Sequence, residues 1–96
     1  MNLSNIHMMW NALEKSTNNS ELTSSQVVGV NLNSLRAKLI AQLNEFLANE
    51  AVDSKALASF AEDTRSLEAV IPHLNGNEQV FYAKLYRICS LVSESS

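Results

Sequence analysis

Few side chains in this 96-residue sequence have the chemistry that catalysis or metal binding requires, and their spacing fits neither. The imidazoles and the thiol are His7, His73 and Cys89, which stand far apart in the chain, whereas zinc ligands occur at short, recognisable spacings. We expect both histidines in polar surroundings. We expect Cys89 to act as a small apolar side chain, because no adjacent basic residue or helix N-terminus would lower its pKa. The sequence therefore predicts no metal site and no nucleophilic cysteine.

The remaining polar residues do not suggest a catalytic or cofactor site either. Most of the ten acidic residues fall on predicted outer helix faces, and no carboxylate pair stands out for acid–base work. The sequence has two glycines, Gly29 and Gly76, which excludes glycine-rich phosphate-binding loops. We therefore predict that the chain is not an enzyme, and we expect no cofactor and no small-molecule substrate.

Composition indicates one small folded domain, covering residues 1–96. Apolar residues make up 46% and charged residues 18%, which is enough apolar material to form a core. A domain of this size buries only about 60–65% of the surface of its unfolded chain, so added burial from a partner or a second copy is expected. The single cysteine, the lack of a basic N-terminal region and the lack of a long apolar stretch predict a cytoplasmic protein without membrane contact.

The charge pattern does not favour nucleic acid as a partner. The net charge is −3, and the seven basic residues are scattered without a run. Binding to phosphates needs a concentrated basic face. One alternative stays open, in which dimerisation brings Arg36 with Lys38, or Lys84 with Arg87, into such a face.

The first part of the chain predicts one short helix and a connector. Apolar residues at helical spacing place the helix at residues 4–15, and Ser4 or Asn5 can cap its start. We expect residues 16–31 to be a flexible connector. Within it, residues 21–31 form a loop or an early helical turn, because a strand there would have no partner.

Three longer helices follow. Leu35, Leu39 and Leu43 recur at helical spacing in the first of them. Pro72 disfavours helical geometry at Ile71 and lacks an N–H donor, so the second helix should end there. Short links make the three helices antiparallel neighbours. The predicted helices cover 32–49, 53–71 and 78–93, and residues 94–96 form a tail.

These elements together predict an all-α fold. It is a small three- or four-helix antiparallel bundle, in which a short N-terminal helix precedes the three longer ones. We expect the bundle to be dimeric or bound to a partner.

The helix at 78–93 has more apolar surface than one core uses. Its apolar side chains span an arc of about 240°, whereas a helix of a small bundle needs little more than 100°. The helix is therefore either central in the bundle or apposed to another chain. Under the second reading, the predicted interface residues of this helix are Phe81, Tyr82, Leu85, Tyr86 and Cys89.

The first helix gives a weaker indication of binding. Met8, Met9 and Trp10 are consecutive, so they cannot all face one core. Methionine and tryptophan also suit adaptable binding surfaces. Either Met9 and Trp10 pack inside with Met8 half exposed, or the helix docks on a neighbouring subunit. We add Met8 and Trp10 to the predicted interface.

Two short resemblances concern the helical hairpin. Residues 35–45 and 65–69 resemble the hairpin of small co-chaperones that hold type III secretion needle subunits. Residues 52–55 and the final aromatic helix resemble small helical regulators of biofilm formation and stress responses. Both resemblances imply a leucine-patterned hairpin, and neither assigns a role to a particular residue.

The sequence thus favours a non-catalytic protein-interaction module, such as an adaptor, a secretion-type chaperone or a regulatory subunit. It would bind another protein, or itself as a homodimer, through the apolar face of the last helix. The alternative is a small dimeric, DNA-associated transcriptional regulator.

Overall fold

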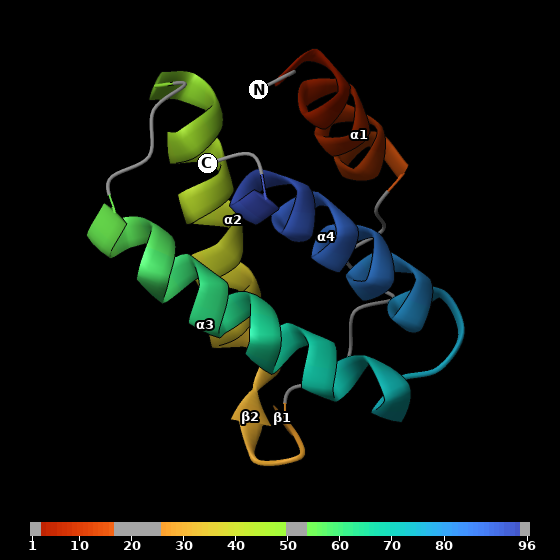
Figure 1. Ribbon diagram of the computed structural model, residues 1–96. Helices are drawn as coiled ribbons and strands as arrows, with labels where there is room; N and C mark the ends of the chain where they lie inside the picture. The colour runs from red at the N-terminus through yellow and green to blue at the C-terminus, as the bar shows by residue number, and fades with distance from the viewer. Residues whose placement is uncertain (1–2, 17–25, 50–53, 95–96) are drawn as a thin grey trace.

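The computed structural model describes residues 3–16, 26–49 and 54–94, and it shows a small all-α bundle, as the sequence predicts. Four α-helices account for most of these residues (Figure 1). Each helix begins and ends close to its predicted bounds. The helices are α1 Leu3–Ser16, α2 Leu32–Asn49, α3 Ser54–Val70 and α4 Gly76–Glu94.

Residues 26–31 form a β-hairpin, so the prediction of a loop or helical turn is wrong for this part of the connector. Strand β1 (Gln26–Val27) pairs antiparallel with β2 (Val30–Asn31). Val28 and Gly29 link the strands with φ angles of 52° and 77°, as a two-residue type I′ turn requires. The strand-favouring valines therefore pair with each other. Residues 17–25 of the predicted connector lie outside the described residues.

Helix α2 starts directly after the hairpin, because Asn31 caps it. The Oδ1 atom of Asn31 accepts a hydrogen bond of 3.1 Å from the backbone N–H of Ser34, which satisfies one of the first-turn donors that have no partner within the helix. The predicted cap of α3, Asp53, lies outside the described residues.

Pro72 ends α3, as predicted. The chain continues from Val70 into a single 3-10 turn, η2 (Ile71–His73), which contains the proline. Gly76 has a φ of +60°, a conformation that glycine adopts without steric cost, and it opens α4. The amide of Gln79 donates a 3.0 Å hydrogen bond to the carbonyl of Ile71, which ties the start of α4 to this turn.

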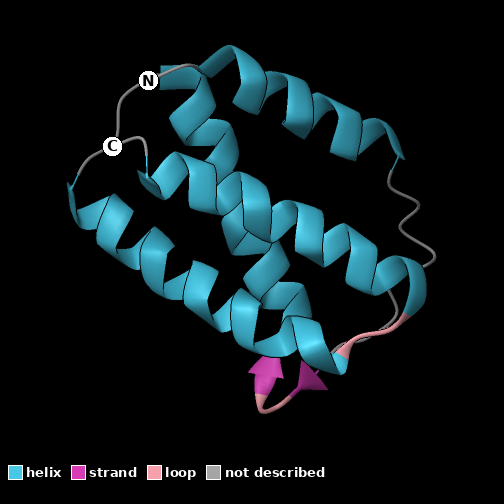
Figure 2. Cartoon of the chain, turned by 45° about the vertical axis from the view of Figure 1, so that its right-hand side comes forward, coloured by secondary structure: helices cyan, strands magenta, loops and turns pink. Residues whose placement is uncertain are grey.

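Helix α4 lies in the middle of the bundle. Figures 1 and 2 show α1 and α3 on either side of α4, running opposite to it, while α2 crosses behind them. All four helices contribute buried side chains to one apolar core. Phe46 of α2 and Phe60 of α3 meet edge to face with ring centroids 5.1 Å apart, an arrangement that aromatic rings prefer.

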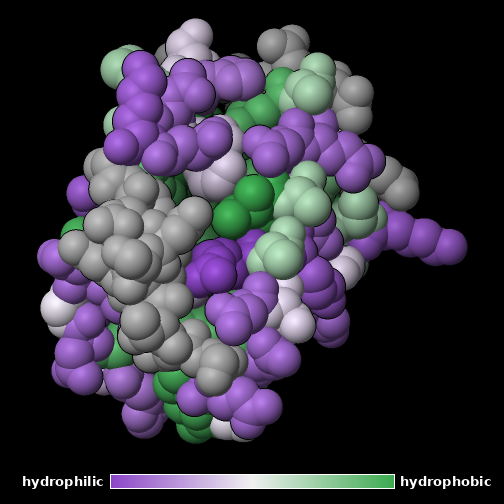
Figure 3. Space-filling model, turned by 180° about the vertical axis from the view of Figure 1, so that it is seen from behind, coloured by the Kyte–Doolittle hydropathy of each residue, from purple (hydrophilic) through white to green (hydrophobic). Residues whose placement is uncertain are grey.

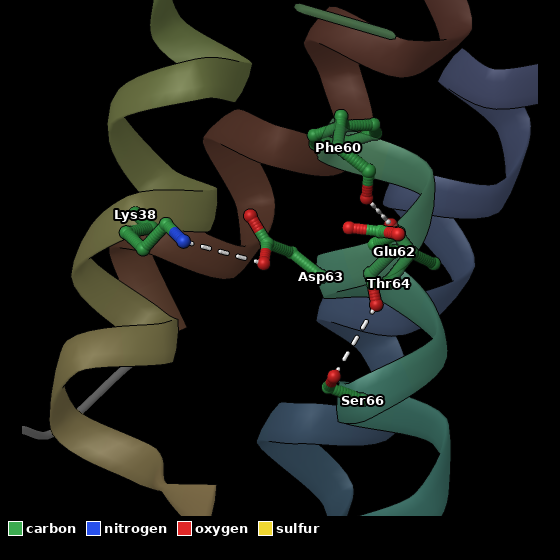
Figure 4. Close-up of polar contacts among 6 residues, drawn as sticks. All are labelled: Lys38, Phe60, Glu62, Asp63, Thr64 and Ser66. Atoms are coloured by element: carbon green, nitrogen blue, oxygen red, sulfur yellow. Dashed lines mark hydrogen bonds and ion pairs between the residues drawn. The ribbon is translucent and has the colours of Figure 1, made fainter. Parts of the chain in front are cut away.

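Polar contacts also fasten α2 to α3. Lys38 Nζ lies 3.4 Å from Asp63 Oδ1, and Figure 4 shows the two side chains reaching across from neighbouring helices. Because the lysine is 59% exposed, this ion pair contributes at most about 1 kcal/mol. In the core, the hydroxyl of Thr64 donates a 2.8 Å hydrogen bond to the carbonyl of Phe60 (Figure 4), which lets a polar side chain be buried.

Candidate protein-interaction site

The chain itself covers most of the wide apolar arc of α4. Tyr82, Leu85 and Cys89 have an exposed fraction of 0%. Because α4 packs against both α1 and α3, its apolar side chains are buried on two sides. These three residues are therefore core residues in this fold, and no partner reaches them. The central position of α4, one of the two explanations considered for its composition, accounts for their burial.

Tyr82 has a polar partner within the chain. Its hydroxyl accepts a 2.9 Å hydrogen bond from Nη1 of Arg36, and Nη2 of the same guanidinium lies 3.2 Å from Asn33 Oδ1. Burial raises the pKa of Tyr82, while the charge and hydrogen bond of Arg36 act in the opposite direction and Glu78 raises it further. This contact joins α2 to α4.

Phe81 and Tyr86 lie at the edge of the buried arc. Both are half-buried and pack against the core. The Tyr86 hydroxyl donates a 2.9 Å hydrogen bond to Glu68 Oε2 of α3, and the ring of Phe81 meets Tyr82 edge to face, with centroids 4.9 Å apart. Part of each ring stays accessible, so of the five predicted interface residues of α4 these two alone reach the surface.

Cys89 has the properties of a small apolar side chain. It is fully buried, and burial raises the pKa of its thiol to about 12, with the Thr64 side chain acting in the opposite direction. At neutral pH the thiol is therefore protonated and inaccessible, which removes it as a nucleophile. Within the described residues, no group of three histidine, cysteine or acidic side chains could hold a metal ion.

One of the two basic pairs considered for nucleic-acid binding is engaged inside the chain. Arg36 bonds Tyr82 and Asn33, and Lys38 pairs with Asp63. Lys84 and Arg87 differ, because both are exposed and neither has a hydrogen-bond or ion-pair partner among the described residues. Both cations line a hollow between α1 and α4.

Helix α1 has one buried face and one exposed methionine. Ile6, Trp10 and Leu13 are buried, and the indole N–H of Trp10 donates a 3.1 Å hydrogen bond to Asn44 Oδ1 of α2. Trp10 is therefore a core residue and not an interface residue. Met8 is 64% exposed and Met9 is half-buried against the core.

A hollow of about 360 Å³ lies between α1 and α4. Its walls are i, i+3, i+4 sets from the two helices, so the hollow follows the helix surfaces. Leu13 and Ile88, which are 3% and 1% exposed, form apolar parts of it. The lining residues are Met9, Ala12, Leu13, Lys84, Arg87 and Ile88.

A second, shallower depression of about 570 Å³ adjoins the first one along α4. Arg87 lines both, so they form one continuous surface on the outer side of this helix. Its lining is more mixed in polarity, and it includes Tyr86. The lining residues are Ala83, Tyr86, Arg87, Ser90, Leu91 and Glu94.

Sequence reasoning did not find the hollow between α1 and α4. The helical spacing of Met9 and Leu13 predicts that both face the core, but it does not indicate which helix α1 packs on. Ala12 and Arg87 carry no motif that marks them as a site. The one sequence signal near the hollow is the run of methionines in α1, of which Met9 lines it.

Other apolar surface in the described part of the chain is more scattered. Figure 3 shows apolar side chains in the middle of the face that is hidden in Figure 1. Helix α2 lies on that side, and the described apolar side chains that it exposes are the alanines Ala37, Ala41 and Ala48. Val28 and Val80 are the large exposed apolar residues besides Met8. Val28 lies on the hairpin, and Val80 lies near the start of α4, one turn before the lining residue Lys84.

The chain matches no protein-family model, no curated protein and no solved structure at a significant level. Among the described residues, no helix combines the length and apolar character that crossing a membrane would need.

Proposed function

We propose that this protein is a non-catalytic interaction module that binds a partner protein in the hollow between α1 and α4, as an adaptor, chaperone or regulatory subunit would. The observation that carries the proposal is the hollow itself. Buried Leu13 and Ile88 stay at its base, half-buried Met9 forms a wall, and 64% exposed Met8 lies beside it. A concave apolar surface of this kind, next to adaptable methionines, is typical of helix-binding grooves.

The chemistry of the buried groups supports a binding role over a catalytic one. The thiol of Cys89 is buried and its pKa is raised to about 12. The phenol oxygen of Tyr82 accepts a hydrogen bond from Arg36. Among the described residues, Lys84 and Arg87 are the polar side chains that line the hollow, and both are exposed. The unpaired thiol also suits a reducing compartment, so a cytoplasmic location is part of the proposal.

Site-specific photo-crosslinking in the producing cells tests the proposal. A benzophenone amino acid at position 83, an exposed position of the adjoining depression, places the reactive group beside the hollow without filling it. We expect a defined covalent adduct with a partner protein after illumination. The matched control places the same residue at position 58, where Ala58 is exposed on α3 and outside both described depressions.

The proposal requires that the two positions give different amounts of covalent adduct. Equal adducts from positions 83 and 58, or none from position 83 at any protein concentration, would show that the hollow is not a binding site. A melting curve of each substituted protein, followed by circular dichroism, verifies that the bundle is folded in both.

A further inference from the structure

We infer that the occupant of the α1/α4 hollow is an amphipathic helix of a different protein that carries carboxylates beside its apolar side chains. This inference rests on the proposed function, and it adds the shape and the charge of the partner. Its basis is the position of two unpaired cations, Lys84 and Arg87, next to an apolar floor.

The walls of the hollow favour a helix as the occupant. Met9, Ala12 and Leu13 line one side, and each helix contributes residues at i, i+3 and i+4. Such sets form the ridges between which the side chains of a third helix pack. An extended peptide would instead need a free strand edge to pair with or, for a proline-rich segment, an aromatic-lined groove, and the described lining of the hollow has no aromatic residue. The hairpin β1–β2, which has the described strands, lies at the other end of the bundle from α1 (Figures 1 and 2).

The charges favour an acidic partner. Lys84 and Arg87 are one helical turn apart on the exposed side of α4, so their side chains point the same way. Neither forms a hydrogen bond or ion pair with a described residue, and both line the hollow. Carboxylates spaced one turn apart on a docked helix would meet both cations, while its apolar stripe covers Leu13 and Ile88.

The same charges oppose a second copy as the occupant. In a symmetric dimer the same patch meets itself, so the hollow of one copy, whose described lining has Lys84 and Arg87 and no carboxylate, would meet the same lining of the other. Glu94 lies in the adjoining depression. Like charges brought together at an interface are unfavourable. The chain as a whole has a net charge of −3, yet this particular surface presents two cations and, in the hollow, no carboxylate.

Two synthetic helices distinguish charge recognition from apolar recognition. Both have about 16 residues, the same leucine stripe and the same lactam bridge, since unbridged peptides of this length are marginally helical. One has glutamates beside the stripe and the other has lysines. We expect fluorescence anisotropy to show about tenfold tighter binding of the glutamate helix at about 50 mM salt. The preference should shrink at about 300 mM salt.

Charge reversal on the protein gives the decisive comparison. The double variant Lys84→Glu/Arg87→Glu should reverse the preference, so that the lysine helix binds more tightly. Because both side chains are exposed, this variant should keep its fold. If the double variant still prefers the glutamate helix, the inference is overturned.

Filling the hollow separates the inference from the proposed function. Ala12→Trp should weaken the binding of the glutamate helix, while the control Ala58→Trp should leave it unchanged. If both helices bind equally and both are lost in Ala12→Trp, the charge inference fails and the proposed function stands. If no helix binds, or if Ala12→Trp has no effect, both fail. Dimerisation in sedimentation that Ala12→Trp abolishes would identify a second copy as the occupant and overturn the inference.

Discussion

At the scale of single residues, the hairpin turn contains the most strained position of the described backbone. Val28 is the one described non-glycine residue with a positive φ, at 52°. A β-branched side chain is unfavourable there, because its Cβ crowds the neighbouring carbonyl oxygen. The side chain is 62% exposed and therefore contributes little packing in return.

We predict that Val28→Asn stabilises the protein by about 1 kcal/mol, because Asn-Gly is the preferred sequence of a type I′ turn. Urea unfolding followed by circular dichroism measures the change. The control is Val80→Asn, at a similarly exposed position inside α4, where no gain is expected. A loss of stability in Val28→Asn would show that Val28 makes contacts that outweigh its strain.

A second prediction at this scale concerns the pH dependence of stability. The ordinary pKa of a cysteine is near 9.0, and burial raises that of Cys89 to about 12. Between these values the unfolded chain has lost the proton while the folded chain keeps it. The contribution of the Cys89 thiol to the free energy of unfolding is therefore complete below about pH 9 and is lost as pH rises toward 12. The free energy of unfolding should fall by about 1.4 kcal/mol per pH unit in this range.

The variant Cys89→Ala checks the assignment of this slope. It should cost about 1 kcal/mol or more at pH 7 through lost packing, yet its stability should fall less steeply above pH 9. Urea titrations at a series of pH values from 8 to 10 measure both slopes. Identical slopes in the two proteins would assign the pH dependence to other groups, of which buried Tyr82, whose pKa is also raised, is the first to consider.

At the scale of the elements, α1 is the least integrated helix. It packs on α4 through its buried face and reaches α2 through the hydrogen bond from Trp10 to Asn44. Helices α2 and α3 are linked by the Phe46–Phe60 contact and the Lys38–Asp63 ion pair. An element with fewer anchors opens at a lower free energy than the rest of a protein.

We predict that Leu13→Ala loosens α1 before the other helices unfold. Leu13 is 3% exposed, so its truncation should cost about 2–5 kcal/mol of docking energy. Trp10 is the single tryptophan, and its fluorescence reports on α1. In this variant the fluorescence transition in urea should precede the circular dichroism transition. Leu67→Ala, in the core of α3, should shift both transitions together, and coincident transitions in Leu13→Ala would contradict the prediction.

The elements also show what the sequence predicts and what it does not. Helical spacing of apolar residues, together with Pro72, placed the ends of the helices well. The sequence indicates no pairing partner for a strand in residues 21–31, whereas Val27 pairs with Val30 of the same stretch, three residues away. The wide apolar arc of α4 leaves two readings open, a central helix or contact with another chain, because spacing shows only how much of the surface is apolar. It does not show how many helices of the same chain cover Tyr82 and Cys89.

At the scale of the whole molecule, the position of α4 leaves one boundary incompletely filled. Helices α1 and α3 both pack on α4, and α2 crosses behind them (Figure 1). The hollow lies where α1 packs on α4, and the two helices leave about 360 Å³ open between them. Ala12 has the smallest side chain in the lining, so a larger apolar side chain at this position would fill part of the space.

We therefore predict that Ala12→Leu stabilises the free protein and weakens partner binding at the same time. Leucine has nearly the helix propensity of alanine, so a gain reflects apolar surface buried in the hollow and should be about 0.5–1 kcal/mol. Ala58→Leu, on the exposed surface of α3, controls for the substitution itself and should change neither quantity. Urea unfolding and photo-crosslinking from position 83, in the adjoining depression, measure the two effects. A stabilised Ala12→Leu variant that crosslinks as well as the original would mean that the hollow is a packing defect and that partners bind elsewhere.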